Sequence, residues 1–211
     1  MSGRSDPVAE AVAAARRGAL IVLPTDTVYG VGTRPDHPAA TAALFEAKGR
    51  PRDLTLPVLV ASSAEADTIA VVDERARRLA VACWPGPLTL VVARTSRSAD
   101  WDLGGDPHTI GVRVPAHRLA LAVLAGSGPL AVTSANLTGE PPARTCDELV
   151  ATFGERVAVY LCQDDPLEGR ASTVVDLTGS EPEVLRVGDL APTVLHRLLA
   201  GEGPLLDSGP S

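Results

Sequence analysis

Aromatic residues are scarce in this chain, at 3% of its 211 residues. Its core must therefore be built from alanine, valine and leucine, and recognition of nucleic acid by stacked bases, which needs exposed rings, is disfavoured. Long apolar runs are missing as well: no stretch of about 18 apolar residues occurs, and Asp6 and Glu10 interrupt the N-terminal segment. We expect no membrane span, no secretory signal and a cytoplasmic globular protein.

Basic residues are outnumbered, 19 against 26 acidic ones, which gives a formal net charge of −7. No general attraction to nucleic acid or to an anionic membrane is expected, so any anion must be bound by a local cluster. Familiar nucleotide signatures are missing too. There is no G-x-x-x-x-G-K-[ST] loop, the Gly30-Val31-Gly32 pair lacks a third glycine, and no G-x-S-x-G elbow occurs.

Cysteine is rare. Cys83, Cys146 and Cys162 form an odd set without the pairwise spacing of a metal site. This pattern predicts reduced, packed thiols rather than a disulfide framework or a zinc centre.

Two residue types occur only once. Of the 19 basic residues, Lys48 is the only lysine and the rest are arginine, and Asn136 is the only asparagine. A composition that disfavours both types yet keeps one of each makes these positions candidates for chemistry. The alternative is chance survival at neutral surface positions.

Helical and strand patterns alternate along the chain, which predicts an α/β fold with one twisted, open, mixed sheet and flanking helices. We expect one domain over residues 1–200 and a disordered tail over 201–211. The glycines at 30 and 32 predict a turn, Pro57 predicts an edge position for the strand at 56–60, and the long loop at 94–108 is of a kind that often covers a site. The expected helices cover 7–17, 38–48, 63–70, 73–83, 116–125, 145–153 and 192–200, and the expected strands 20–23, 56–60, 87–93, 109–115, 129–132, 156–161, 172–177 and 183–187.

Cations and polar side chains recur at the ends of these elements. Taken singly, an arginine within a strand is most simply a structural ion pair. Taken together, the residues predict a positive pocket for a polyanion such as a nucleotide, beside a small polar co-substrate. No obvious nucleophile or general base accompanies them, which favours a reaction driven by positioning and charge stabilisation. The set is Thr27, Lys48, Arg50, Thr109, Arg113, Ser134, Asn136, Ser172 and Arg186.

Six motifs in order closely resemble the YrdC-like family over about residues 19–188. They are Pro24–Gly30 (PTDTVYG), Lys48–Pro51 (KGRP), Trp84–Leu90 (WPGPLTL), Arg113–Pro115 (RVP), Thr133–Asn136 (TSAN) and Ser172–Asp176 (STVVD). The resemblance implies a twisted open sheet with a concave, positively charged face. It also implies a threonylcarbamoyl-AMP synthase, which forms threonylcarbamoyl-AMP and pyrophosphate from L-threonine, bicarbonate and ATP, with Mg²⁺ accompanying the nucleotide. Partner proteins would then transfer the threonylcarbamoyl group to a tRNA adenosine.

The same resemblance suggests roles for individual residues. Threonine would be bound by Thr27, Arg113, Ser134 and Ser172. ATP would be bound by Lys48, Arg50, Thr109, Asn136, Arg144 and Arg186. The catalytic set would be Lys48, Arg50, Ser134 and Asn136, and no metal ligand is expected from the protein itself. Asp26 and Tyr29 stay open between orienting their neighbours and touching the ligand.

Three other interpretations remain. A paralogue could serve another carbamoyl-adenylate chemistry, although retention of all four signature residues argues against lost synthesis. An RNA-binding module could use the concave face, with at most a weak tRNA contact given the acidic charge and few aromatics. A purely structural interaction domain is disfavoured by the single lysine and asparagine.

Overall fold

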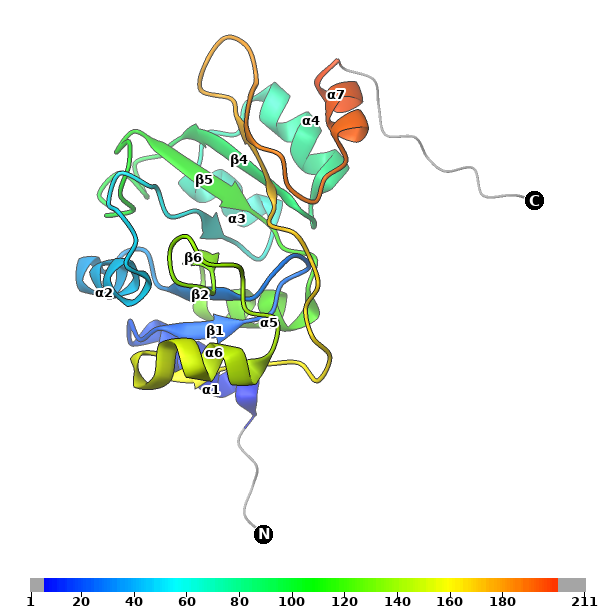
Figure 1. Ribbon diagram of the computed structural model, residues 1–211. Coiled ribbons are helices and arrows are strands. Elements are labelled where there is room, and N and C mark those ends of the chain that lie inside the picture. The colour runs from blue at the N-terminus through cyan, green and yellow to red at the C-terminus, as the bar shows by residue number, and fades with distance from the viewer. Residues whose placement is uncertain (1–5, 201–211) are drawn as a thin grey trace.

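The computed structural model describes residues 6–200 (Figure 1). The predicted tail, 201–211, lies outside these residues. Within them the helices are α1 (Pro7–Arg16), α2 (Pro38–Lys48), α3 (Ser63–Ile69), α4 (Glu74–Cys83), α5 (Arg118–Ser127), α6 (Cys146–Phe153), the 3-10 turn η1 (Gly154–Arg156) and α7 (Pro192–Leu199). None of the helices in this part of the chain has the length and apolar character needed to cross a bilayer.

All strands of residues 6–200 belong to one sheet, in the order β7-β1-β2-β6-β3-β5-β4-β8-β9. Parallel pairs such as β4 with β8 alternate with antiparallel pairs such as β4 with β5, so the predicted mixed sheet is confirmed. The strands are β1 (Ile21–Leu23), β2 (Gly30–Thr33), β3 (Val58–Leu59), β4 (Leu88–Ala93), β5 (Thr109–Arg113), β6 (Leu130–Ser134), β7 (Val159–Tyr160), β8 (Thr173–Asp176) and β9 (Glu183–Arg186).

Local sequence explains where several helices begin. The Asp6 carboxylate accepts the Val8 N–H at 3.0 Å, and Pro7 occupies the first turn of α1. Thr145 and Glu148 form a reciprocal capping box at α6. Gly49, at φ +58°, ends α2 directly after Lys48, as the sequence predicts.

The two faces of the sheet are covered differently. Alternate residues of a strand point to opposite faces, and on one face Val22, Val58, Ile110 and Leu90 join a large core that also contains residues of α2, α3, α4 and α6. On the other face, α1 and α5 cover β7, β1, β6 and part of β3, through a smaller core. The remainder of that second face, over β5, β4 and β8, carries no helix from the described residues.

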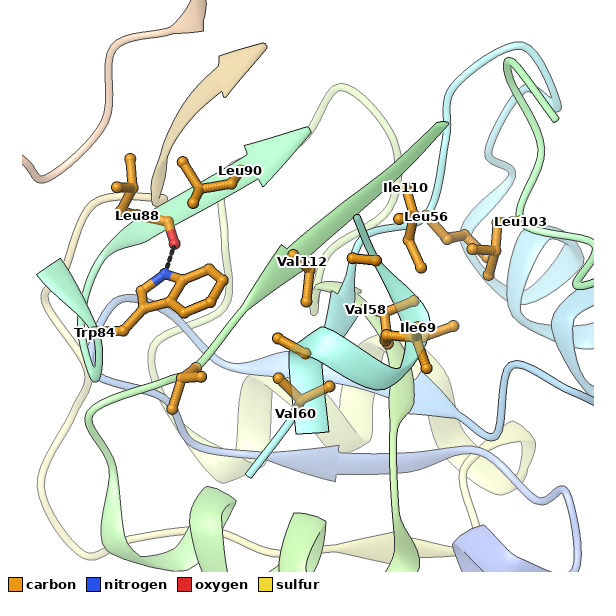
Figure 2. Close-up of a cluster of buried hydrophobic side chains, with 14 of the residues drawn as sticks. Leu56, Val58, Val60, Ile69, Trp84, Leu88, Leu90, Leu103, Ile110 and Val112 are labelled. Carbon is orange, nitrogen blue, oxygen red and sulfur yellow. Dashed lines mark hydrogen bonds between the residues drawn. The ribbon is translucent and has the colours of Figure 1, made fainter. Parts of the chain in front are cut away.

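Figure 2 shows the large core beneath β4 and β5. Ile69 of α3 lies among Leu56, Val58 and Ile110, all fully buried. Trp84 closes one end, and its indole N–H donates to the Leu88 carbonyl at 2.7 Å. This packing fixes one face of β4 and β5, so the side chains of their opposite face are held in defined positions.

The expected turn at Gly30 and Gly32 is wrong, because these residues form β2 between β1 and β6. A Cβ at Gly30 would come within 2.5 Å of Val132 Cγ1, and one at Gly32 within 2.6 Å of both Val132 Cγ2 and the Ala131 carbonyl. The glycines therefore leave room for the Val132 side chain of the neighbouring strand. They do not reverse the direction of the chain.

Two further predictions about single elements are wrong. β3 lies between β6 and β5 in the middle of the sheet, not at an edge, because Pro57 precedes the two paired residues and costs no ladder hydrogen bond. Gly126 does not end the helix of residues 118–127. It lies inside α5, which ends at Gly128 with φ +81°.

The predicted free thiols at Cys146 and Cys162 are also wrong, since the two form a disulfide, whereas Cys83 is free and buried. The bond ties the start of α6 to the end of β7. From there the chain between β7 and β8, gold in Figure 1, runs from the part of the molecule with α1 and α6 towards the part with α4 and α7. We call residues 163–171 the crossing segment.

Candidate functional site

A cavity of about 480 Å³ lies on the part of the second sheet face that α1 and α5 leave uncovered. Its floor follows strand alternation: Thr109, Gly111 and Arg113 come from β5, and Thr89 and Val91 from β4. The predicted polar residues do lie at strand ends. However, these ends point in both directions, since Thr109 and Arg113 are opposite ends of one strand, about 13 Å apart at 3.3 Å per residue.

Seven of the ten predicted site residues line this cavity, although they are spread over the sequence. They are Thr27, Arg50, Thr109, Arg113, Ser134, Ser172 and Arg186. The other three, Lys48, Asn136 and Arg144, do not line it.

At one end of the cavity, each nitrogen of the Arg113 guanidinium donates a hydrogen bond to protein. Arg113 is 5% exposed, and its Nε donates to the Gly86 carbonyl at 2.9 Å. One terminal nitrogen donates to Thr27 Oγ1 at 3.0 Å and the other to Asp26 Oδ1 at 2.6 Å. Burial lowers the pKa of Arg113 while Asp26 opposes this shift, so the buried charge is compensated by an adjacent carboxylate.

Hydroxyl groups surround the same end. Ser172 Oγ accepts from Arg186 Nη2 at 3.1 Å and lies 2.9 Å from Thr89 Oγ1. Arg186 Nε also donates to the Ser172 carbonyl at 3.0 Å. The crossing segment packs here as well, since a Cβ at Gly169 would come within 1.7 Å of the Thr27 carbonyl. This end is a small polar corner with an arginine at its base.

Arg186 acts on the two other arginines of the cavity. Burial and the neighbouring Arg186 lower the pKa of Arg50, and Arg186 also lowers the pKa of Arg113. Arg50 donates through Nε to the Leu54 carbonyl and through Nη2 to the Thr55 carbonyl. An anion placed between neighbouring guanidinium groups stabilises their charged forms. Arginines whose pKa is lowered by a neighbouring arginine are therefore expected at a phosphate or carboxylate site.

Lys48 is almost fully buried, at 2% exposure. Its ammonium donates to the carbonyl oxygens of Ser134 and Asn136, the latter at 2.7 Å. Burial, followed by the charge of Arg50, lowers the pKa of Lys48 to about 8. The lysine thus ties the end of α2 to the turn after β6, and in this structure it contacts protein carbonyls.

Asn136 and Arg144 are likewise engaged with protein. The Asn136 amide donates to the Leu137 and Glu140 carbonyls at 2.7 and 2.8 Å, and its Oδ1 is one of the few buried side-chain oxygens in residues 6–200 without a partner. Arg144 pairs with Glu168 of the crossing segment at the exposed surface. An unpartnered buried oxygen is costly, so Asn136 Oδ1 is the atom of this turn most in need of a donor.

Several cavity residues were not predicted. Thr25 and Thr89 lie in the quoted motifs, where a hydroxyl within an apolar run was the available signal. Asp53, Asp106 and Asp176 add carboxylates to the lining. Asp176 ends a quoted motif, whereas Asp53 and Asp106 are indistinguishable in sequence from surface acids. Within the loop at 94–108, which was expected to cover the site, only Asp106 lines the cavity. The crossing segment was not predicted to contribute, yet it supplies Ala171.

A second hollow of about 370 Å³ lies beyond the other ends of β2 and β6. Two of its three arginines are occupied structurally: Arg34 binds Asp36 through both carboxylate oxygens and caps the Arg16 carbonyl, while Arg16 caps the Gly126 carbonyl. These bonds satisfy carbonyl groups at the ends of α1 and α5. This structural role is enough to explain why Arg16 and Arg34 occur there.

Comparison with known proteins places the chain in a family. A Mycobacterium leprae protein is 43% identical over 197 residues, which are 93% of this chain and 89% of that protein. The threonylcarbamoyl-AMP synthase of Sodalis glossinidius is 36% identical over 191 residues, 87% of this chain and 97% of that one. The crystal structure of Pyrococcus abyssi Sua5 complexed with L-threonine superposes with a TM-score of 0.82 at 33% identity, over 90% of this chain and 56% of that one.

A family model named Sua5/YciO/YrdC, with the description "Telomere recombination", matches residues 13–188. This range contains every residue that lines the cavity. Since the match covers most of the chain, the protein belongs to the Sua5/YciO/YrdC family.

Proposed function

We propose that the protein is a threonylcarbamoyl-AMP synthase, which joins L-threonine, bicarbonate and ATP into threonylcarbamoyl-AMP with release of pyrophosphate. Relatives carrying this activity in their names share up to 98% of their length with this chain. The structural observation that supports it best is one cavity in which Arg186 lies close enough to lower the pKa of Arg50 and of Arg113, beside a small corner of hydroxyls. Such a cavity suits a polyphosphate beside an amino acid.

The corner at Arg113 is our proposed threonine subsite. Arg113 keeps one N–H free on each terminal nitrogen after its three hydrogen bonds, enough for the two oxygens of a carboxylate. Thr27 and Ser172 add hydroxyl oxygens beside it. The related Sua5 structure was solved with L-threonine, which supports this choice of ligand.

The triphosphate is best accommodated between the remaining cations. Arg50 and Arg186 both line the cavity, and the pKa of Arg50 is depressed by Arg186. Thr109 lies at the far end of β5 from Arg113, so nucleotide and amino acid would occupy opposite ends of one strand. We assign the catalytic set of Lys48, Arg50, Ser134 and Asn136 two tasks: Arg50 contacts phosphate, and Lys48 holds the turn that presents Ser134 and Asn136.

The chemistry needs little from the protein beyond position and charge. The threonine nitrogen bonds to the bicarbonate carbon, water is lost, and a carbamate forms. A carbamate oxygen then bonds to the α-phosphorus as the bond to the bridging oxygen of pyrophosphate breaks. Charge grows on the leaving pyrophosphate, and Arg50 and Arg186 lie where they would stabilise it.

Magnesium is the metal implied for the nucleotide. The residues present fit it: Asp53, Asp106 and Asp176 line the cavity, and Mg²⁺ is usually held by one or two carboxylates together with substrate phosphates. Residues 6–200 contain no group of three acidic, histidine or cysteine side chains that could hold a metal unaided. When bound, Mg²⁺ would neutralise phosphate charge.

The product is an activated carbamate, so a second protein must accept it. We place the protein in the cytoplasm, upstream of transferases that move the threonylcarbamoyl group to tRNA, and we place its catalytic unit within residues 1–200. The downstream transferase follows from the proposed product, because the mixed anhydride bond of that product hydrolyses unless another protein consumes the product.

A pyrophosphate-release assay tests the proposal. We expect release that requires threonine and bicarbonate together, and a product with the mass of threonylcarbamoyl-AMP. Release that is indifferent to threonine would contradict the proposal. A shift of unmodified tRNA in a gel at physiological salt, without pyrophosphate release, would favour the RNA-binding alternative.

Arg50→Ala should lower turnover at least about 100-fold, since it removes a charged contact to the leaving group. Arg52→Ala is the matched control: Arg52 lies two residues away, pairs with exposed Asp102 and does not line the cavity. It should retain near-normal turnover. Equal activity of the two variants would remove Arg50 from the site.

A further inference from the structure

Asp26 is a partly buried carboxylate beside the cavity that does not line it. Its side chain is 13% exposed. One oxygen, Oδ1, accepts from Arg113 Nη2 at 2.6 Å and from the Ala116 backbone N–H at 2.9 Å. Asp26 therefore links the loop after β1 to the segment after β5 at the place where Arg113 lies.

Two threonine hydroxyls lie beside this contact. Thr25 Oγ1 donates to the Val28 carbonyl at 2.6 Å, because that carbonyl cannot donate. It also accepts the backbone N–H groups of Thr27 and Val28, each at 3.2 Å, so its proton and both of its lone pairs are engaged. Its 2.9 Å contact with Thr27 Oγ1 therefore does not fix the Thr27 proton.

Thr27 Oγ1 accepts from Arg113 at 3.0 Å. On Arg113 only N–H groups remain free, and these suit an acceptor such as a carboxylate. The corner therefore offers donors to the carboxylate of an amino acid at Arg113, with the Thr27 hydroxyl beside them.

We propose that Asp26 is a positioning residue for the ligand carboxylate: by fixing the Arg113 guanidinium, it presents two free N–H groups to that carboxylate. The proposal rests on the proposed function for the identity of the amino acid. The arrangement of Arg113 and Thr27 stands on the geometry alone.

Two variants separate the parts of this role. Asp26→Asn keeps an acceptor for Arg113 and Ala116 but removes the charge, and Asp26→Ala removes both. We expect threonine affinity to fall about tenfold in Asp26→Asn and further in Asp26→Ala, since hydrogen bonds to charged groups contribute that much. ATP affinity should stay within about twofold. Asp36→Asn, which changes an exposed carboxylate paired with Arg34, is the matched control and should change neither.

A ligand without the carboxylate makes the test specific. L-threoninol replaces the carboxylate by an alcohol, so its affinity, measured by calorimetry or competition, should change by less than about twofold in Asp26→Asn. Equal losses for threonine and threoninol, or equal losses for threonine and ATP, would overturn the proposal, because they would reflect general damage to the site.

A ligand-free measurement separates this proposal from the proposed function. The Nε–Hε NMR signal of Arg113, assigned with Arg113→Lys, should show slow guanidinium rotation in the native protein and faster rotation in Asp26→Ala. If the native protein binds no threonine, the proposed function fails while this signal still reports positioning. An Arg113 signal unchanged in Asp26→Ala would refute the positioning role.

Discussion

At the scale of single residues, Lys48 shows how one side chain can be recognised from sequence while its protein contacts cannot. Its position as the only lysine marked it for chemistry, and a phosphate contact was the natural inference. The structure gives the ammonium two carbonyl partners at 2% exposure. Sequence identifies the residue type, whereas the partner depends on how β6 brings Ser134 and Asn136 against the end of α2.

The lowered pKa of Lys48 predicts a pH dependence of stability. Its folded value, about 8, lies below the ordinary 10.5, so between these values the unfolded chain binds more protons and the free energy of unfolding rises with pH. Relative to Lys48→Met, the native protein should gain up to about 3 kcal/mol across this window. Urea denaturation at several pH values measures the difference. Identical pH dependence in both proteins would mean that Lys48 is not perturbed.

At the scale of elements, β2 depends on two glycines that differ in what they face. A Cβ at Gly30 would meet only the Val132 side chain closely, and its nearest backbone atom is 3.7 Å away. At Gly32 the Ala131 carbonyl is at 2.6 Å in addition to Val132. A side chain can be shortened by mutation, whereas a backbone carbonyl of the neighbouring strand cannot be moved cheaply.

Gly30→Ala and Gly32→Ala should therefore each lower the free energy of unfolding by about 1–3 kcal/mol. Combining each with Val132→Ala should distinguish them. In the Gly30 pair, the double variant should lose about 1 kcal/mol less free energy of unfolding than the sum of the two single losses. In the Gly32 pair the clash with the Ala131 carbonyl should persist, so the losses should add. Chemical denaturation of the five variants and the native protein provides the two cycles. The same coupling in both pairs would contradict the structure.

The elements also show which predictions sequence supports. Helix starts at Asp6 and Thr145 were predictable because a cap is formed by residues within one turn. The strand at Gly30 was not, because the neighbours that require glycine there, Val132 and Ala131, are about a hundred residues away. The central place of β3 was missed for the same reason: pairing partners, and not the local proline, decide it.

At the scale of the whole molecule, the site was predictable as a set of residue types but not as a surface. Seven residues of the cavity could be identified from the sequence, five of them within the motifs, while their placement across the open face of β5, β4 and β8 follows from which helices cover the rest. The disulfide was missed because spacing along the chain does not report proximity. Cys146 and Cys162 meet only once α6 lies beside β7.

That disulfide should stabilise the entire fold. Its cysteines are 16 residues apart, and closing a loop of this length contributes about 3 kcal/mol by restricting the unfolded chain. Reduction, or Cys146→Ser with Cys162→Ser, should lower the free energy of unfolding by about that amount in urea. The double variant should not respond to reductant. A native protein that is equally stable with and without reductant would contradict the bond's role.

The cavity draws on the chain from Thr25 to Arg186, and this has a consequence for biosynthesis. The loop that carries Thr25 and Thr27 leaves the ribosome well before Ser172 and Arg186 emerge. Contacts so distant in sequence form late. A nascent or truncated chain that lacks Arg186 lacks part of the cavity lining, so we expect it neither to capture threonine nor to commit ATP.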